Sequence, residues 1–140
     1  QSKGVKVAFF LQFGYLGETL EDIQKTIKMV LDIMPDEIGI SVSYPLPGTK
    51  FYDKVKADLV MKSNWTDSDD LDMMFENTYP PAFYKVLHRY VHNRYRINKG
   101  ILRLRGKLKS RQDSLVKDVA RMVYHIPMAF MNKRKIQSHL

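Results

Sequence analysis

AFFLQFGYLGETLEDIQKTIKMVLDIMPDEIGISVSYPLPGT, residues 8–49, is the stretch that decides the fold. A short run of bulky apolar residues, which begins one residue earlier at Val7 and extends to Leu11, comes first, and a second apolar run extends from Ile38 to Val42. Both runs are short and are followed by turns that contain glycine, a pattern typical of buried strands rather than helices. We therefore predict two buried strands.

The segment between the two runs predicts an amphipathic helix. Thr19 offers a hydroxyl for the N-cap, and Glu21 and Asp22 follow in the first turn, where acidic side chains are favoured. Pro35 should end the helix. The apolar residues recur at helical spacing and share one face: Leu20, Ile23, Ile27, Val30, Leu31 and Met34. Two buried strands joined by a helix form a βαβ unit, and one helix cannot cover both faces of such strands. We therefore expect a slice of a larger parallel sheet or barrel.

Two turns in this stretch resemble those of a known superfamily. Residues 10–19, FLQFGYLGET, are similar to the G-x-P-G-E-T turn of radical S-adenosylmethionine (SAM) enzymes, and residues 43–49, SYPLPGT, resemble the P-G-T turn after the next barrel strand. With residues 64–65 and 69–71 added, the run resembles the cobalamin-binding branch, which includes proteins labelled as anaerobic magnesium-protoporphyrin IX monomethyl ester cyclases. The likeness covers about the first ninety residues, and it departs from the family at Leu16, where proline is usual.

The resemblance implies the C-terminal fragment of a radical SAM iron–sulfur enzyme of the oxidoreductase or methyltransferase type. S-adenosylmethionine, an iron–sulfur cluster and cobalamin are the implied cofactors of the full-length parent. Clusters of this kind are held by cysteine thiolates, and this sequence contains no cysteine. We therefore expect no catalytic residue, no metal ligand and no bound cofactor in the fragment alone, and we expect the upstream domains of the same chain as its partner.

The same resemblance points to four cofactor-binding residues: Gln12, Gly14, Tyr44 and Gly48. All four stand at or just beyond the C-terminal ends of predicted strands, which is where barrel enzymes place their active sites. Gln12 brings an amide, Tyr44 brings a ring and a hydroxyl, and the glycines allow close backbone approach to a ligand. The alternative is that both glycines serve only the turns, that Tyr44 packs in the core and that Gln12 faces solvent.

Helices are predicted for the rest of the chain. Thr49 should cap a short helix, Pro80-Pro81 should precede a longer one that Gly100 interrupts, and a last basic helix should be kinked or ended by Pro127. The predicted fold class is an α/β fragment. One βαβ unit of a partial radical SAM (β/α) barrel occupies residues 1–66, and a helical, basic C-terminal region occupies residues 67–140.

Charge is divided unevenly between the two parts of the chain. Residues 1–81 contain 8 basic and 13 acidic side chains, whereas residues 82–140 contain 15 and 2. A basic helical region can dock on an acidic domain of the same chain, lie on an anionic membrane surface, or bind nucleic acid. Nucleic acid is the least favoured of the three. The alternative function is therefore a basic helical binding module.

Three acidic or histidine patterns are interpreted as structural. Residues 67–72 lack the glycine and the later glutamate of a calcium loop, and their acidic side chains are typical of a helix N-terminus. His88 and His92 would share one helix face, but the neighbouring arginines disfavour a cation there, which favours a solvated face. Glu18 could act as a general base, yet an acid beside a helix start is usually structural.

The predicted location and assembly follow from composition and from the incomplete sheet. The absence of cysteine fits a reducing compartment, and no apolar run reaches the ~18 residues of a membrane span. We expect a cytoplasmic protein, and the basic helices leave open a peripheral position at a membrane. Strands with open edges and uncovered faces predict that the fragment associates with itself.

Overall fold

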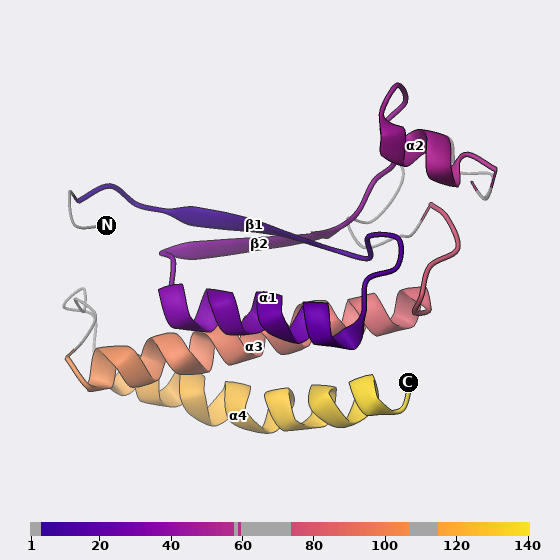
Figure 1. Ribbon diagram of the computed structural model, residues 1–140. Helices are drawn as coiled ribbons and strands as arrows, with labels where there is room; N and C mark the ends of the chain where they lie inside the picture. The colour runs from indigo at the N-terminus through magenta and orange to yellow at the C-terminus, as the bar shows by residue number, and fades with distance from the viewer. Residues whose placement is uncertain (1–3, 58, 60–73, 107–114) are drawn as a thin grey trace.

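The computed structural model describes residues 4–57, 59, 74–106 and 115–140 (Figure 1). The predicted boundary at residue 66, the segment 64–65 and the acidic stretch 67–72 lie outside these residues. The elements follow the order β1 (Ala8–Phe13), α1 (Leu20–Ile33), β2 (Glu37–Val42), α2 (Lys50–Val55), α3 (Pro81–Leu104) and α4 (Leu115–Gln137). The fold is mixed α/β, with a small parallel sheet followed by helices.

The predicted βαβ unit is confirmed. β1 and β2 pair in parallel, in a register that runs from Ala8 opposite Glu37 to Phe13 opposite Val42. In the described part of the chain these two strands make up the whole sheet. Each strand therefore has one edge without a neighbouring strand there.

Local signals set the limits of α1 as predicted. The Thr19 side chain accepts a hydrogen bond from the Asp22 N–H at 3.3 Å, and the Thr19 N–H donates to the Asp22 carboxylate at 3.1 Å, which completes a capping box. At the other end Met34 takes a left-handed conformation with φ of 50°. Pro35 follows directly, and a residue before proline is disfavoured in the α region.

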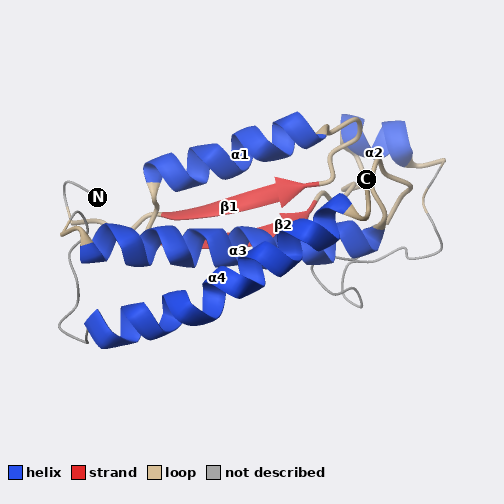
Figure 2. Cartoon of the chain, turned by 90° about the horizontal axis from the view of Figure 1, so that it is seen from below, coloured by secondary structure: helices blue, strands red, loops and turns tan. Residues whose placement is uncertain are grey.

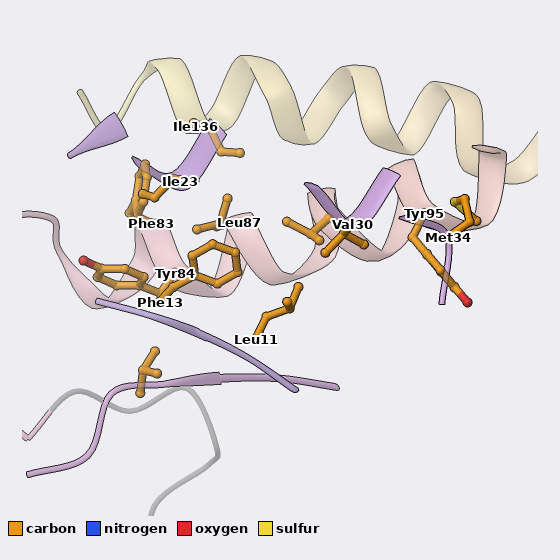
Figure 3. Close-up of a cluster of buried hydrophobic side chains, with 12 residues drawn as sticks. Leu11, Phe13, Ile23, Val30, Met34, Phe83, Tyr84, Leu87, Tyr95 and Ile136 are labelled. Carbon is orange, nitrogen blue, oxygen red and sulfur yellow. The ribbon is translucent and has the colours of Figure 1, made fainter. Parts of the chain in front are cut away.

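The core lies between one face of the sheet and the helices. Figures 1 and 2 show α1 and α3 lying side by side along the same face of β1 and β2. Leu11 and Phe13 point into this layer, because alternate strand residues face the same side. Figure 3 shows the cluster they form with helix residues such as Ile23, Leu87 and Tyr84. Strands from the N-terminal half and α3 from the basic half thus share one hydrophobic core.

The opposite face of the sheet is uncovered in the described residues. Phe10, whose side chain is 87% exposed, stands on this face, and its pairing partner in β2 is Gly39. A Cβ atom added to Gly39 would come within 2.9 Å of a ring carbon of Phe10. The ring therefore rests on the bare backbone of β2, and Gly39 is the residue that leaves it room.

The expected interruption at Gly100 is wrong, because α3 continues to Leu104. Gly100 is buried against α4, and a Cβ atom there would lie 2.9 Å from both Cγ and Sδ of Met122. Close packing between the helices outweighs the weak helix propensity of glycine. Gly100 is thus a contact point between α3 and α4.

Pro127 does not end α4, which runs through it to Gln137. Proline removes one backbone donor, so the carbonyl of Val123 loses its usual partner four residues on. Val123 is 68% exposed, so this carbonyl lies on the solvent side of the helix.

The short helix predicted after Thr49 is confirmed as α2, where Thr49 Oγ1 accepts a hydrogen bond from the Tyr52 N–H at 3.1 Å. None of the helices in the described ranges is long and apolar enough to cross a bilayer.

Leu87→Ala tests the shared core. Leu87 is 2% exposed and belongs to the main cluster, so we expect a loss of about 2–5 kcal/mol in the free energy of unfolding. Leu104→Ala, on the same helix at a 40% exposed position, is the matched control and should change it by less than about 0.5 kcal/mol. Urea denaturation followed by circular dichroism measures both. Equal effects would contradict the placement of the core.

Phe10→Lys tests whether the uncovered face mediates self-association. Burying a phenylalanine side chain contributes about 1.5–3 kcal/mol, so its replacement by lysine should weaken association roughly tenfold or more. Sedimentation over a range of concentrations measures this, and Met29→Lys on the exposed side of α1 is the control. A wild-type chain that stays monomeric at every concentration would refute the expectation.

Candidate functional site

The candidate site is the edge of the sheet where β1 and β2 both end. Parallel strands bring their carboxyl ends to the same edge, and such edges are the usual binding positions of α/β folds. Figure 1 shows that the turns after both strands, α2 and the start of α3 all lie at this end. The segments 14–19, 43–49 and 74–80 therefore come together here.

Gly14 is the centre of this edge. It is buried and left-handed, with φ of 78°, a conformation that suits glycine. Its N–H donates to the Glu18 carboxylate at 2.7 Å, and its carbonyl accepts a hydrogen bond from the side-chain amide of Asn77. Both backbone groups of Gly14 are thus held by side chains of the protein.

Glu18 closes the turn through this bond. Burial raises the pKa of the Glu18 carboxyl, the Gly14 N–H lowers it, and the nearby carboxylate of Asp22 raises it further. The Glu18 N–H also donates to the Tyr15 carbonyl at 2.9 Å. These contacts agree with the structural interpretation of Glu18.

Tyr84 places a buried polar group near the same edge. Its side chain is 1% exposed, and its hydroxyl is buried near the backbone of Tyr79. Burial raises the pKa of the Tyr84 hydroxyl, and the negative charge of Glu18 raises it further. Tyr84 is therefore a neutral phenol. Helical spacing in the sequence places Tyr84 on an apolar helix face, but it does not show where the hydroxyl lies.

The four predicted residues occupy different surroundings. Gln12 is exposed, and it stands on the uncovered face of the sheet opposite Ser41 in β2. Gly48 is exposed and left-handed, with φ of 84°, and nothing lies within 4 Å of a Cβ atom built on it. Tyr44 is half-buried and packs against both hydrophobic clusters. Gly14 and Gly48 thus have the conformations their turns require, and Gln12 has the most accessible side chain of the set.

Asn77 is a contact that the sequence analysis missed. It lies 63 residues from Gly14 along the chain, so no local pattern links the two. Ser43 was likewise treated only as part of a turn, yet it is 5% exposed and its N–H donates to the Phe13 carbonyl at 2.8 Å. This bond ties the end of β2 to the end of β1.

The two histidines of α3 lie outside this edge. The rings of His88 and His92 are 4.5 Å apart, and both side chains are half-buried rather than fully solvated. Burial lowers the pKa of His92 to about 4, with smaller contributions from His88 and Arg96. Within the described ranges no three His, Cys, Asp or Glu residues gather as a metal site. The packing of α4 beside α3 explains why the predicted solvated face is partly covered.

A scan against models of known protein families finds no match to this chain, and a search of curated proteins finds none with significant similarity.

His92 predicts how stability depends on pH. Its pKa in the folded chain, about 4, is below the ordinary 6.5, so the unfolded chain binds the proton more readily between these values. The free energy of unfolding should therefore fall as pH is lowered from about 6.5 towards about 4. In His92→Gln the free energy of unfolding should change less steeply with pH, because unfolding then takes up fewer protons, by at most about one. Denaturant titrations at several pH values measure this, and identical slopes for the two proteins would contradict it.

Proposed function

We propose that residues 8–49 form one βαβ unit in the wall of a radical SAM (β/α) barrel. The chain is then the C-terminal part of a cyclase-like enzyme and is not competent for catalysis alone. One observation carries the proposal. The sheet is covered by α1 and α3 on one face, while its other face carries the exposed side chains of Phe10 and Gln12. Barrel strands have this arrangement, with helices outside and side chains filling the interior.

The position of Gln12 supports a nucleoside contact on the inner face. Its amide can both donate and accept hydrogen bonds, as an adenine edge requires. It stands next to the turn at Gly14, at the end of the strand where barrel enzymes bind their ligands. Tyr44 and Gly48 extend the same edge from β2. The chain therefore contributes barrel wall and contacts to S-adenosylmethionine.

An iron–sulfur cluster does not fit the residues of this chain. The sequence has no cysteine, and such clusters depend on cysteine thiolates. The reductive cleavage of S-adenosylmethionine that defines the family cannot start from these 140 residues. Cluster and cobalamin belong to upstream domains under this proposal, and the reading frame that contains this segment should encode a C-x-x-x-C-x-x-C run before it. A complete reading frame without that run would exclude the proposal.

Titration with S-adenosylhomocysteine, a stable analogue, tests the nucleoside contact in the chain itself. We expect amide shifts in NMR spectra that concentrate at Gln12, Gly14 and Ser43. Gln12→Ala should weaken binding about fivefold, because a net hydrogen bond contributes about 1 kcal/mol. Gln24→Ala, at an exposed position on α1, is the matched control and should leave binding unchanged. Shifts that are absent at millimolar analogue, or that Gln12→Ala leaves intact, would count against the contact.

A further inference from the structure

Helix α4 buries three polar side chains and leaves several large apolar side chains exposed. Asp118, His125 and Asn132 are all at most 9% exposed, on a buried side that also includes Ala129 and Ile136. Val116, Val123 and Phe130 are 75%, 68% and 61% exposed on the other side. An amphipathic helix of a globular domain normally shows the opposite arrangement. The outward apolar side therefore needs a specific explanation.

Polar pairs with α3 fix this orientation. Asp118 accepts a hydrogen bond from Arg103 Nη1 at 3.0 Å, and His125 Nδ1 lies 2.8 Å from the side-chain oxygen of Asn93. Turning α4 about its axis would bury the apolar side but would leave these buried groups without partners, which costs more than a hydrogen bond contributes. The exposure of the apolar side is thus built into the helix pair.

The outward residues form a continuous stripe. They follow one another at alternating spacings of three and four, which keeps them on one side of the helix over about 21 Å. We define the α4 stripe as Val116, Val119, Val123, Ile126 and Phe130, all of them exposed. Tyr124 and Met131, also exposed, widen it on one side.

Cations lie beside the C-terminal end of the stripe. The exposed basic residues of the helix are Lys117, Arg121, Lys133, Arg134 and Lys135, and Arg121 is turned towards the buried carboxylate of Asp118, 3.7 Å away. Asp118 is the one acidic residue in residues 115–140, and it is buried against α3. The guanidinium of Arg134 lies 5.4 Å from the ring centre of Phe130, at the end of the stripe. Apolar and cationic groups therefore share a surface that exposes no carboxylate.

We propose that α4 binds an anionic lipid surface, with the α4 stripe at the boundary between headgroups and acyl chains. A basic, apolar-faced helix that lies in the membrane plane has this composition, and each cation near an anionic leaflet adds to the attraction. A second copy of this chain would bring like charges together. Nucleic acid would use the cations but would leave the apolar stripe in water.

Vesicle flotation tests the proposal with the intact chain. We expect binding to phosphatidylcholine vesicles that contain 30% phosphatidylglycerol, much weaker binding to phosphatidylcholine alone, and loss of binding as salt rises. The double variant Val123→Ser/Phe130→Ser should weaken binding at least about tenfold. Lys133→Gln/Arg134→Gln/Lys135→Gln should do the same, whereas Lys25→Gln/Lys28→Gln/Lys50→Gln, with equal charge loss elsewhere, should not.

Three outcomes would overturn the proposal. They are equal binding to both vesicle types, no binding to either, and salt-dependent binding to DNA with none to vesicles. A change of sedimentation in Val123→Ser/Phe130→Ser without vesicle binding would assign the α4 stripe to a second copy instead. Phe10→Ser separates this test from the barrel proposal, because it alters the sheet face and should leave flotation unchanged. Circular dichroism verifies that each variant is folded.

Discussion

The hydroxyl of Tyr95 holds the two halves of the chain together. It lies 2.7 Å from the carbonyl oxygens of both Pro35 and Asp36, in the turn that leads from α1 into β2. Burial, together with the nearby acidic charges, raises the pKa of this hydroxyl to about 12, so it keeps the proton it donates. Asn98 adds a bond from its amide to the Leu31 carbonyl at 3.0 Å, and Lys99 contacts the Asp36 carbonyl. The last turn of a helix leaves carbonyls without partners, and α3 supplies a donor to the Leu31 carbonyl as well as donors to the turn that follows.

The sheet, α1 and α4 are arranged around α3. One side of this helix is apolar and packs on the sheet through residues such as Leu87 and Val91. Its other side is polar and pairs with α4 through Asn93 and Arg103. The two contacts differ in kind, because burial of apolar area stabilises the first, whereas matched hydrogen bonds select the geometry of the second. Among the described residues, the uncovered sheet face with Phe10 and the α4 stripe expose large apolar side chains.

Local sequence signals were enough to predict the βαβ unit. The Thr19 cap, the apolar face of α1 and the stop at Pro35 each act within a few residues, and the structure places the helix where they indicate. The expectation at Gly100 failed because the side chain that fills its space, Met122, comes from another helix. The orientation of α4 depends on Arg103 and Asn93, which belong to another helix and which no periodicity within α4 reveals. The hydrogen bond between Asn77 and Gly14 was also missed, because its two residues lie 63 positions apart in the chain.

The polar pairs between α3 and α4 also restrict how the two helices can slide. Asp118 and His125 are two helical turns apart, and their partners follow in reverse order along α3, as an antiparallel hairpin requires. A shift of one turn would separate both pairs at once and would remove Met122 from the notch at Gly100. An interface made only of leucines would tolerate several axial registers of the two helices, whereas buried polar pairs are satisfied in one register. The two polar pairs therefore fix the axial register of α4 against α3. This register also sets where the α4 stripe lies relative to the rest of the fold.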